Sequence, residues 1–463
     1  MTPATVDTII HNARIVTMDA ERRVLRNGSI AIRGTEIADV GPADVIDARY
    51  EAAARVDGSR FVITPGYIDG HIHVTGDPLT RDFMPDNVSE KFADKLTKWV
   101  LPRYYAHTPD DERLSARLAG IEMLRSGTTC FAEAGTIRYL DEVVDGMMST
   151  GIRGRVGIWV EGRAFGDPAE QPRRSAEAIA LLEDEVRRHP AAEDRRVSAW
   201  PILVGHSTNP DEVWQAAKRI ADERGLAVSA HMSARQSDPD WFLDATGRRP
   251  VEHLAALGVL GPNLCLTHMV HVDESELGLL AASGTNVILC PLAAVKGAFG
   301  ASRSGRHADM VERGINLLLG SDGYASDLAR QLHLVSGLFK DSREDITFMP
   351  AWETLELVTV NAAKALQLGG SIGSIEPGKK ADLVCHDTWR PEWVPVTNVV
   401  NQLVWSADGR DVHSVWVDGV RVIEDYRSTM LDEDELYAKA QEAGDAIIER
   451  SKLPFVCPWP TVG

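Results

Sequence analysis

The pattern of hydrophobic and polar positions changes twice along the chain, and each change predicts a different kind of structure. Over residues 1–64, β-branched and other apolar residues come in short runs, at 7–19, 28–41 and 60–66, separated by glycine or asparagine. Runs of this kind, bounded by turn-forming residues, are typical of short strands. Residues 1–64 are therefore predicted to form the first part of a small β-rich module.

From residue 65 to 374, strand-like runs alternate with long amphipathic segments. A helical pattern at 209–225 precedes an apolar run at 226–233, and a second helical pattern at 248–262 precedes another apolar run at 264–273. Repeated alternation of strand and helix predicts a parallel sheet, and a segment of this length favours a closed (β/α)8 barrel, the TIM barrel. Residues 65–374 are predicted to form this barrel.

Strand patterns return at 379–387, 401–409 and 411–425. We expect residues 375–430 to pair with the N-terminal strands and to complete a small β-sandwich domain. The remaining segment, 431–463, is predicted to be a C-terminal helix over 432–451, opened by acidic residues, followed by a proline-rich tail. The predicted fold class is thus α/β, a TIM barrel with a β-sandwich built from both ends of the chain.

Composition narrows the possible partners. With 44% hydrophobic and 25% charged residues the chain has the profile of a soluble globular protein. The net charge of −19 argues against a nucleic acid or an anionic membrane as partner, because both require a basic face. The 5 cysteines are scattered and contain no CxxC pair, which favours a reducing compartment. We expect a cytoplasmic homo-oligomer that acts on a small molecule and has no membrane span.

Histidine and aspartate recur where the predicted barrel strands end. His71 and His73 lie two residues apart, so on an extended segment both imidazoles point to the same face. His231, His268 and Asp322 each follow a later apolar run. Any one of them has a simple structural explanation, as a capping or core histidine or as a turn aspartate. Together they are harder to explain in that way, because barrel enzymes build their sites at the C-terminal ends of the strands.

Several imidazoles with one carboxylate suit Zn²⁺, Fe²⁺ or Co²⁺ better than Mg²⁺ or Ca²⁺. Such an ion with an open coordination position lowers the pKa of a bound water from 15.7 towards about 7. The residues by themselves therefore predict a metal-dependent hydrolase.

The order of short motifs along the chain resembles the amidohydrolase superfamily, over residues 8 to 425. It is most similar to the branch that holds triazine hydrolases, cytosine-type deaminases and S-adenosylhomocysteine deaminases. The motifs that carry the resemblance are PGYIDGHIH at 65–73, SGTT at 126–129, AHMS at 230–233, LTHMVHVDESEL at 266–277, CPLAAVKGAFG at 290–300, GINLLLGSDGYAS at 314–326, TVNAAKALQL at 359–368 and GSIEPGKKADLV at 373–384.

The resemblance implies a role for each matching residue. The implied metal ligands are His71, His73, His231 and Asp322. The family assigns His268 to the attacking water or the substrate oxygen, lets Asp322 take the proton of the water, and has a substrate-contacting histidine where His206 stands. The predicted fourth strand, 197–205, contains no lysine that could bridge two metals. We therefore expect one divalent transition metal per chain, Zn, Fe or Co.

The sequence departs from this branch after its fifth strand. The branch usually reads HxHxxE there, with the glutamate as proton shuttle, and by that alignment Ser233 and Gln236 replace the second histidine and the glutamate. A carboxamide does not exchange a proton near pH 7. Cleavage of an amide, urea, carbamate or thiocarbamate bond is therefore the preferred interpretation, because polarising a carbonyl demands less proton shuttling. Phenylurea and thiocarbamate hydrolases of the same superfamily are the nearest analogies.

Two alternatives stay open. The chain could deaminate or dechlorinate an N-heterocycle, with Glu133, Glu161 or His271 as the shuttle. It could also be a non-catalytic binding protein of this fold, which is disfavoured because the ligand positions are kept. The residues expected to contact substrate are His206, His271, Gln236, Arg163, Trp99, Met232 and Phe299. For the last four of these, an ordinary loop or core position is an equally simple interpretation.

Overall fold

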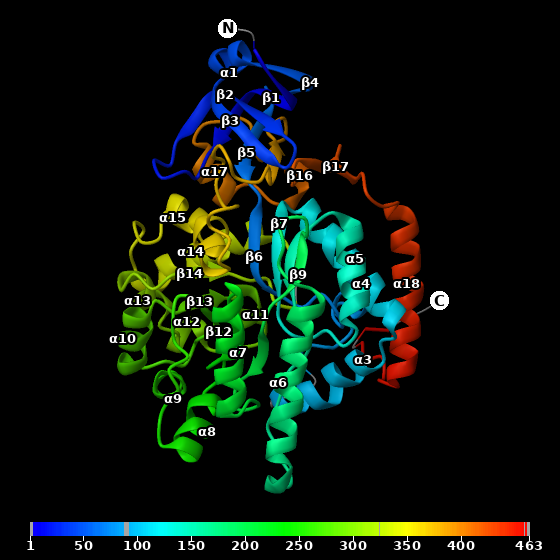
Figure 1. Ribbon diagram of the computed structural model, residues 1–463, viewed down its shortest axis with the longest axis vertical. Coiled ribbons are helices and arrows are strands. Elements are labelled where there is room, and N and C mark those ends of the chain that lie inside the picture. Colours follow the sequence, from blue (N-terminus) through cyan, green and yellow to red (C-terminus); the bar gives the residue numbers. More distant parts are fainter. Residues whose placement is uncertain (1–2, 88–91, 324, 458, 461–463) are drawn as a thin grey trace.

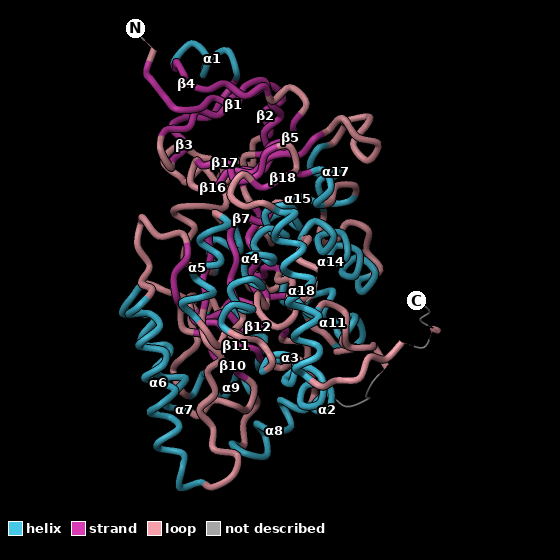
Figure 2. The backbone as a smooth tube through the Cα atoms, turned by 90° about the vertical axis from the view of Figure 1, so that its right-hand side faces the viewer, coloured by secondary structure: helices cyan, strands magenta, loops and turns pink. Residues whose placement is uncertain are grey.

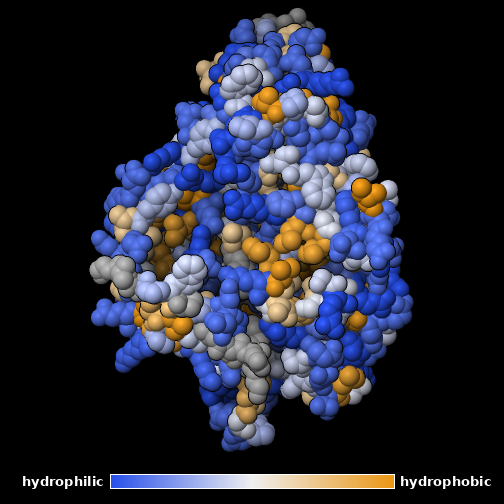
Figure 3. Space-filling model, turned by 180° about the vertical axis from the view of Figure 1, so that it is seen from behind, coloured by the Kyte–Doolittle hydropathy of each residue, from blue (hydrophilic) through white to orange (hydrophobic). Residues whose placement is uncertain are grey.

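Strands gather in two regions of this computed structural model, which describes residues 3–87, 92–323, 325–457 and 459–460. A 9-stranded sheet lies at one end of the molecule, and two parallel sheets of 4 and 5 strands lie below it, surrounded by helices (Figures 1 and 2). The face in Figure 3 is largely hydrophilic, as the net charge of −19 leads one to expect, and hydrophobic residues gather around hollows in its middle.

The terminal sheet joins the two ends of the chain. Its strands are β1 (Ala4–Val16), β2 (Val24–Arg33), β3 (Glu36–Pro42), β4 (Tyr50–Asp57), β5 (Phe61–Pro65), β15 (Leu383–Asp387), β16 (Val412–Val417), β17 (Val420–Glu424) and β18 (Arg427–Ser428). Strand β5 pairs with β1 on one side and with β15 on the other. The C-terminal strands therefore pair with the N-terminal ones as predicted, but through one continuous hydrogen-bonded sheet rather than two separate ones.

One of the predicted strands is a helix. The segment 401–409 falls largely within α17 (Val399–Trp405), whose first turn is capped by the side chain of Asn398 accepting from the backbone N–H of Asn401. Val399, Leu403 and Val404 are buried on one side of this helix. The apolar residues of this segment thus follow a helical period, which its short length had hidden.

The two parallel sheets carry the strands expected of the barrel. The first contains β6 (Tyr67–Ile72), β7 (Thr128–Glu133), β8 (Arg153–Val156) and β9 (Val197–Ala199), and the second contains β10 (Ile202–Gly205), β11 (Val228–Met232), β12 (Leu264–His268), β13 (Asn286–Leu289) and β14 (Leu317–Leu319). A parallel bridge between Ile72 and Asp322 links the last strand region to the first. The architecture is of TIM-barrel type with an extra domain, while complete closure of an eight-stranded barrel stays a prediction.

Helices connect successive parallel strands, as the alternating pattern predicts. They are α4 (Pro109–Arg125), α5 (Leu140–Thr150), α6 (Gln171–Arg188), α7 (Asp211–Arg224), α8 (Ser237–Thr246), α9 (Pro250–Ala256), α10 (Glu274–Ser283), α11 (Pro291–Lys296), α12 (Ala301–Ser304) and α13 (His307–Glu312). Three more helices follow β14 and lead back to the terminal sheet: α14 (Leu328–Arg343), α15 (Ala351–Glu356) and α16 (Val360–Ala365). Shorter elements are α1 (Ala43–Arg49), η1 (Pro78–Thr80), α2 (Phe92–Lys95), η2 (Leu96–Val100), α3 (Leu101–Tyr105), η3 (Pro168–Glu170) and η4 (Gly409–Asp411). The long surface helices place apolar residues on one side, against the strands.

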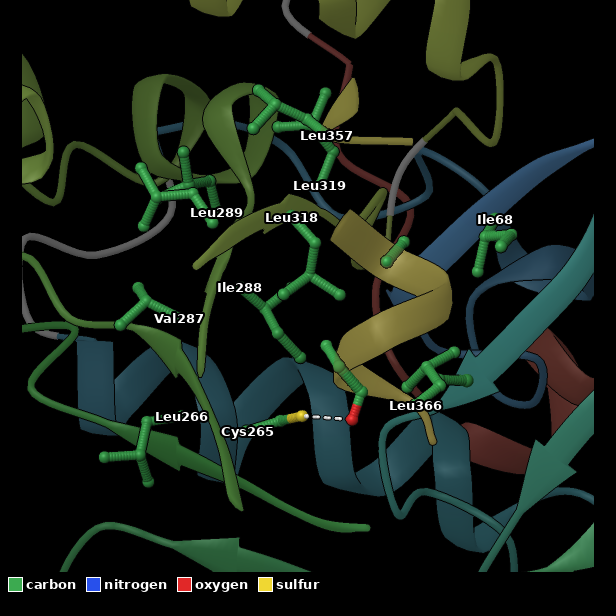
Figure 4. Packing of buried hydrophobic residues seen from close by; sticks show 14 of the residues in the cluster. Ile68, Cys265, Leu266, Val287, Ile288, Leu289, Leu318, Leu319, Leu357 and Leu366 are labelled. Carbon is green, nitrogen blue, oxygen red and sulfur yellow. Dashed lines mark hydrogen bonds between the residues drawn. The ribbon is translucent and has the colours of Figure 1, made fainter. Parts of the chain in front are cut away.

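The main core lies between the parallel strands and the helices that follow them. Figure 4 shows side chains of β12, β13 and β14, among them Ile288 and Leu318, packed beside Leu366 at the end of α16. Both Ile288 and Leu318 are 0% exposed. In the same region the thiol of Cys265 donates a hydrogen bond of 3.6 Å to the carbonyl oxygen of Ala365. This packing fixes the strands whose ends carry the candidate site.

The last helix, α18 (Glu433–Ser451), runs beside α4 and α3 (Figure 1). Its Ile447 is buried against Leu79, and a Cβ added at Gly444 would lie 2.6 Å from the carbonyl oxygen of Leu79. A small residue at that position therefore permits the close approach. Among the described residues no helix is both long and apolar enough to cross a membrane. The limits of the domains, 1–64, 65–374, 375–430 and 431–463, stay predictions.

Candidate metal centre

Three histidines from the carboxyl ends of three parallel strands, one in the first sheet and two in the second, converge at one point. His71 is the last residue but one of β6, His231 lies in β11 and His268 ends β12, and each offers a ring nitrogen within 4.8 Å of the others. The side chains of His71 and His268 are almost completely buried. Parallel strands bring their carboxyl ends to the same edge, which is why residues 71, 231 and 268 meet despite their separation in sequence.

Asp322 and His73 border this group. The Nε2 of His73 lies 3.2 Å from one carboxylate oxygen of Asp322, and the Nε2 of His268 lies 3.9 Å from the other. Asp322 also belongs to a second group, in which it, His71 and the thiol of Cys290 offer ligand atoms within 4.8 Å of one another. The structure thus brings together the four residues predicted as ligands, with His268 and Cys290 beside them.

Neighbouring groups orient the imidazoles. The Nδ1 of His71 lies 3.0 Å from the hydroxyl oxygen of Thr267, and the Nδ1 of His231 donates to the carbonyl oxygen of Val204 over 2.9 Å. The Nε2 of His71 is buried and has no hydrogen-bond partner. An orphaned buried nitrogen is costly unless another group binds it, and in metal sites the second ring nitrogen commonly has such an orienting partner. These residues therefore fit a divalent metal ion.

A buried carboxylate that was not singled out from the sequence joins strand β6 to the segment that follows β14. Asp69 accepts hydrogen bonds from the backbone N–H of Ser321 at 3.0 Å, from its hydroxyl at 2.5 Å, and from the backbone N–H of His71 at 3.1 Å. Burial raises the pKa of Asp69 to about 7. The signal was present in the sequence, because Asp69 and Ser321 lie two and one residues before His71 and Asp322.

Burial and mutual charge set the ionisation of the site. Burial lowers the pKa of His71 and of His231 well below the usual range, so both are neutral and able to offer a lone pair. Burial opposes ionisation of Asp322, but the hydrogen bond and charge of His73 and the charge of His268 together hold the pKa of Asp322 well below its usual range. The site thus combines the neutral imidazoles of His71 and His231 with the carboxylate anion of Asp322.

His206 stands beside the cluster, as expected of a substrate-contacting residue. Its ring stacks on that of His231 with centroids 5.6 Å apart and an interplanar angle of 26°. Its Nδ1 pairs closely with the carboxylate of Asp238 in the first turn of α8. Asp238 was not singled out from the sequence, since an acidic residue in the first turn of a helix is ordinary. Because Asp238 occupies the Nδ1 of His206, the Nε2 of this ring is the nitrogen that could contact a substrate.

Two other predicted contacts lie near His268. The ring of Phe299 meets the ring of His268 edge-on, with centroids 5.3 Å apart. The Nε2 of His271 donates to the carbonyl oxygen of Phe299 over 3.1 Å, so His271 supports the loop that carries this phenyl ring. Phe299 therefore contacts the cluster itself, whereas His271 acts on the site only by holding the backbone of Phe299.

Two predicted contacts are corrected by the structure. Gln236 is exposed, and its amide donates to Asp240 over 3.0 Å, so its side chain follows the first turn of α8 and not the histidine cluster. Met232 is 0% exposed and packs in the main core, because residues next to each other on a strand point to opposite faces and His231 takes the site face.

Arg163 and Trp99 lie away from the histidines. The guanidinium of Arg163 donates to the carbonyl oxygens of Ser207 and Asn209 and stacks over the ring of Trp241 at 4.6 Å, so it braces neighbouring loops. Trp99 is in η2, where its ring lies 6.5 Å from that of Phe83. No described contact joins either of them to the cluster.

The carboxylates considered as alternative shuttles differ sharply. Glu133, at the end of β7, is buried and accepts from the backbone N–H groups of Gly135 and Thr136 and from the hydroxyl of Thr136. Burial raises the pKa of Glu133, and the charge of His73 opposes that rise. Glu161 is exposed. Glu133 is thus the one of the two that faces the site.

The model of the amidohydrolase family matches residues 62–422. The chain belongs to this family. It is 29% identical over 453 residues to a 5'-deoxyadenosine deaminase of Methanosarcina mazei, covering 96% of this chain and 99% of that protein. It is 30% identical over 443 residues to a 5-methylthioadenosine/S-adenosylhomocysteine deaminase of Syntrophobacter fumaroxidans, covering 94% of this chain and 97% of that one.

Solved structures of the family superimpose closely. A zinc-bound adenosine deaminase of Xanthomonas campestris matches with a TM-score of 0.84 and 26% identity, over 96% of this chain and all of that one, 100%. The zinc complex of an atrazine chlorohydrolase from Arthrobacter aurescens matches with a TM-score of 0.84 and 20% identity, over 94% of this chain and 100% of that one. The second likeness shows the fold alone.

Membership confirms three predictions made from the sequence. The chain is an amidohydrolase, it is a hydrolase of carbon–nitrogen bonds, and it uses a divalent metal ion. The identity of the metal, its stoichiometry and the roles of individual residues stay predictions. Gln236 lies outside the cluster, so its side chain does not decide between a carbonyl substrate and an N-heterocycle, and both stay compatible with the family.

Proposed function

We propose that this protein is a metal-dependent deaminase, which hydrolyses the C–NH₂ bond of an N-heterocycle of the adenine type and releases ammonia. The observation that carries the proposal is the convergence of His71, His231 and His268, in which the buried Nε2 of His71 and Nδ1 of His268 have no hydrogen-bond partner. The relatives described above are named as deaminases and match nearly the whole chain. Because Gln236 bonds Asp240 outside the cluster, its side chain gives no argument against deamination.

The ion itself is proposed to be one zinc, iron or cobalt per chain, held by His71, His73, His231 and Asp322. When bound, it supplies Lewis-acid activation of a water molecule. In support, no lysine stands in β9 or β10 to bridge a second ion.

The chain's own residues would then handle protons and orientation. Asp322 is held as an anion, so it is proposed to accept the proton of the attacking water. His268, 3.9 Å from Asp322, is proposed to hold the oxygen that forms on the ring carbon. His206, fixed by Asp238, is proposed to contact the ring of the substrate. Glu133 is proposed to fix the turn after β7 through its bonds to Gly135 and Thr136 rather than to carry the proton onwards.

A second candidate is hydrolysis of an amide, urea or carbamate. One observation favours it: the segment that follows His231, residues 232–237, contains no carboxylate, and the next one, Asp238, is paired with His206. A carbonyl substrate needs less proton delivery to a ring nitrogen. The two candidates differ in their products and are therefore separable by assay.

The test is a paired assay on the zinc-loaded protein. We expect ammonia from adenosine-type amines and no cleavage of simple amides, ureas or carbamates. Asp322→Asn serves as the active-site control and should lower the rate of ammonia release on the order of 100-fold or more. Exposed Gln236→Glu is the second control and should leave the rate within about threefold, since its side chain bonds Asp240 outside the cluster. Cleavage of carbonyl substrates with no ammonia from any heterocycle would establish the second candidate instead.

Two further properties, the oligomeric state and the location of the protein, are also proposed. A homo-oligomer is proposed from the sequence and is tested by sedimentation velocity, in which a single species at the monomer mass of 50.6 kDa contradicts it. A cytoplasmic location is proposed because no cysteine framework typical of secreted domains is present among the cysteines that the structure describes, all of which are free.

A further inference from the structure

The loop between α11 and α12, residues 297–300, places the ring of Phe299 at the edge of the candidate metal centre. This ring meets His268 edge-on, with centroids 5.3 Å apart. Phe299 is half-buried, so part of its ring surface remains accessible. Because His268 is proposed to hold the oxygen that forms on the reacting carbon, the ring of Phe299 borders the place of the substrate ring.

Arg235, in the segment between β11 and α8, contacts this loop in two ways. Its guanidinium carbon lies 4.6 Å from the centroid of the Phe299 ring, and its Nη2 donates to the carbonyl oxygen of Gly297 over 2.8 Å. A cation over the face of an aromatic ring is attracted by the ring quadrupole, and a charged donor makes a stronger hydrogen bond than a neutral one. Arg235 therefore holds both the ring of Phe299 and the backbone beside it.

Two other segments hold the same loop. The Nε2 of His271, which follows β12, donates to the carbonyl oxygen of Phe299 over 3.1 Å. The Nζ of Lys296, the last residue of α11, lies 2.7 Å from a carboxylate oxygen of Asp82, which follows η1. The side chain of Asp82 is 69% exposed, so this ion pair alone contributes little. Segments that follow β6, β11 and β12 thus converge on residues 296–299.

The ring of Phe299 also packs closely on its own loop. A Cβ added at Gly297 would lie 2.5 Å from the Cε1 of Phe299 and 2.8 Å from the carbonyl oxygen of Ala293. The absence of a side chain at Gly297 therefore permits the ring to fold back over the backbone. The position of the ring is then set by Gly297 beneath it, by His268 at its edge and by Arg235 over its face.

We infer that Arg235 is a positioning residue that acts through Phe299, whose ring it holds as a wall against which the flat ring of the substrate packs. The inference rests on the proposed function for the identity of that ring. The wall takes no part in bond changes, so it binds the substrate and the transition state alike. Its loss therefore raises KM and leaves kcat nearly unchanged, and one apolar contact in a pocket is worth on the order of 10-fold.

The kinetic test is a double-mutant cycle on the zinc-loaded protein, with adenosine as substrate and ammonia as the measured product. Phe299→Leu and Arg235→Met should each raise KM on the order of 10-fold and keep kcat within about threefold. The double variant should again show about 10-fold and not about 100-fold, because Arg235 acts through Phe299. Arg235→Lys keeps a cation but loses the planar fork, so its KM should lie between those of the parent and Arg235→Met.

Arg421→Met is the matched control for this cycle. The guanidinium of Arg421 lies over the ring of Trp416 at 4.9 Å, in the terminal sheet, so the control removes the same kind of contact away from the metal centre. It should leave KM unchanged. Zinc content should stay at the parent value in all variants. A KM that Arg235→Met leaves unchanged, or a rise of about 100-fold in the double variant, overturns the inference.

A second measurement is independent of the reaction. The backbone N–H of Phe299 donates to the carbonyl oxygen of Ala294 over 2.9 Å, so exchange of this amide hydrogen reports opening of the loop. By mass spectrometry of the zinc-loaded protein, Arg235→Met should speed exchange in residues 297–300 several-fold, and Arg421→Met should not. Unchanged exchange in Arg235→Met overturns the inference. If adenosine releases no ammonia from the parent, the deaminase function fails by itself, and the exchange rate alone decides whether Arg235 holds the loop.

Discussion

Gly320→Ala tests how closely the first and last barrel strands must approach. A Cβ at position 320 would lie 2.6 Å from the Cβ of His71, 2.8 Å from its carbonyl oxygen and 2.9 Å from its backbone nitrogen. Two of these three atoms are backbone, so no side-chain rotation relieves the contact. Two residues later, the backbone N–H of Asp322 donates to the carbonyl oxygen of His71 over 2.8 Å. The added methyl group therefore pushes apart the strands that carry two predicted ligands.

The expected cost follows from these contacts. Forcing one methyl group into a packed interior costs about 1–3 kcal/mol, and losing the backbone hydrogen bond of Asp322 adds about 0.5–1.5 kcal/mol. We therefore expect Gly320→Ala to lower the free energy of unfolding by about 2–4 kcal/mol. Relief of the clash moves Asp322 by a sizeable fraction of an ångström, and a misplacement of about 1 Å costs on the order of 100-fold in rate.

The assay combines urea unfolding, metal content after dialysis and turnover. Gly278→Ala is the matched control, because position 278 is exposed in α10 and nothing lies within 4 Å of an added Cβ. Replacing an exposed helical glycine by alanine should stabilise the protein by about 0.5–1 kcal/mol. If Gly320→Ala unfolds within about 0.5 kcal/mol of the parent and keeps its metal and rate, the close approach of these strands is not required and the reasoning is refuted.

Three other predictions concern the metal, a carboxylate of the site and a buried acid. Exhaustive chelation should abolish turnover and lower the melting temperature, and metal analysis should find one ion per chain; turnover after chelation, or two ions at full activity, contradicts the proposed centre. Asp322→Asn, which keeps the shape of the side chain and removes its basicity, should lose on the order of 100-fold or more in rate; a loss of only a few-fold with metal retained moves the proton role to His268. Burial raises the pKa of Glu112 to about 7, above its value of 4.5 in the unfolded chain, so stability is greatest below pH 4.5 for this group and declines as pH rises towards 7. The full penalty at pH 8 is roughly 3 kcal/mol, and Glu112→Gln, which keeps an oxygen to accept from the backbone of Arg138 and Tyr139, should remove it and be the more stable protein at pH 8. If the free energies of unfolding of parent and variant differ by the same amount at every pH between 5 and 8, Glu112 is not the source of this pH dependence.

The sequence by itself determined the elements and their order. The alternation of strand and helix, the His71 and His73 pair and the Asp322 turn are local patterns, set by periodicity and by the spacing of residue types, and they were legible without neighbours in space. The same local patterns were enough to identify the amidohydrolase family and to predict metal-dependent hydrolysis. The segment 401–409 was misread because a run this short supports a strand and a helix equally well.

Only the tertiary structure decided which side chains meet. Asp69 accepts a hydrogen bond from Ser321, 252 residues away in the sequence, and Asp238 pairs with His206. The residues that flank each aspartate in the sequence do not distinguish it from an aspartate in a turn or at a helix start. Gln236 stands five residues after His231 and still turns away from the cluster, because the first turn of α8 begins there and sets its direction. The position of Phe299 beside His268 depends on segments that follow β6, β11 and β12 together. Contacts of this kind arise from how strands and helices pack, and packing is a property of the whole chain that no single stretch encodes.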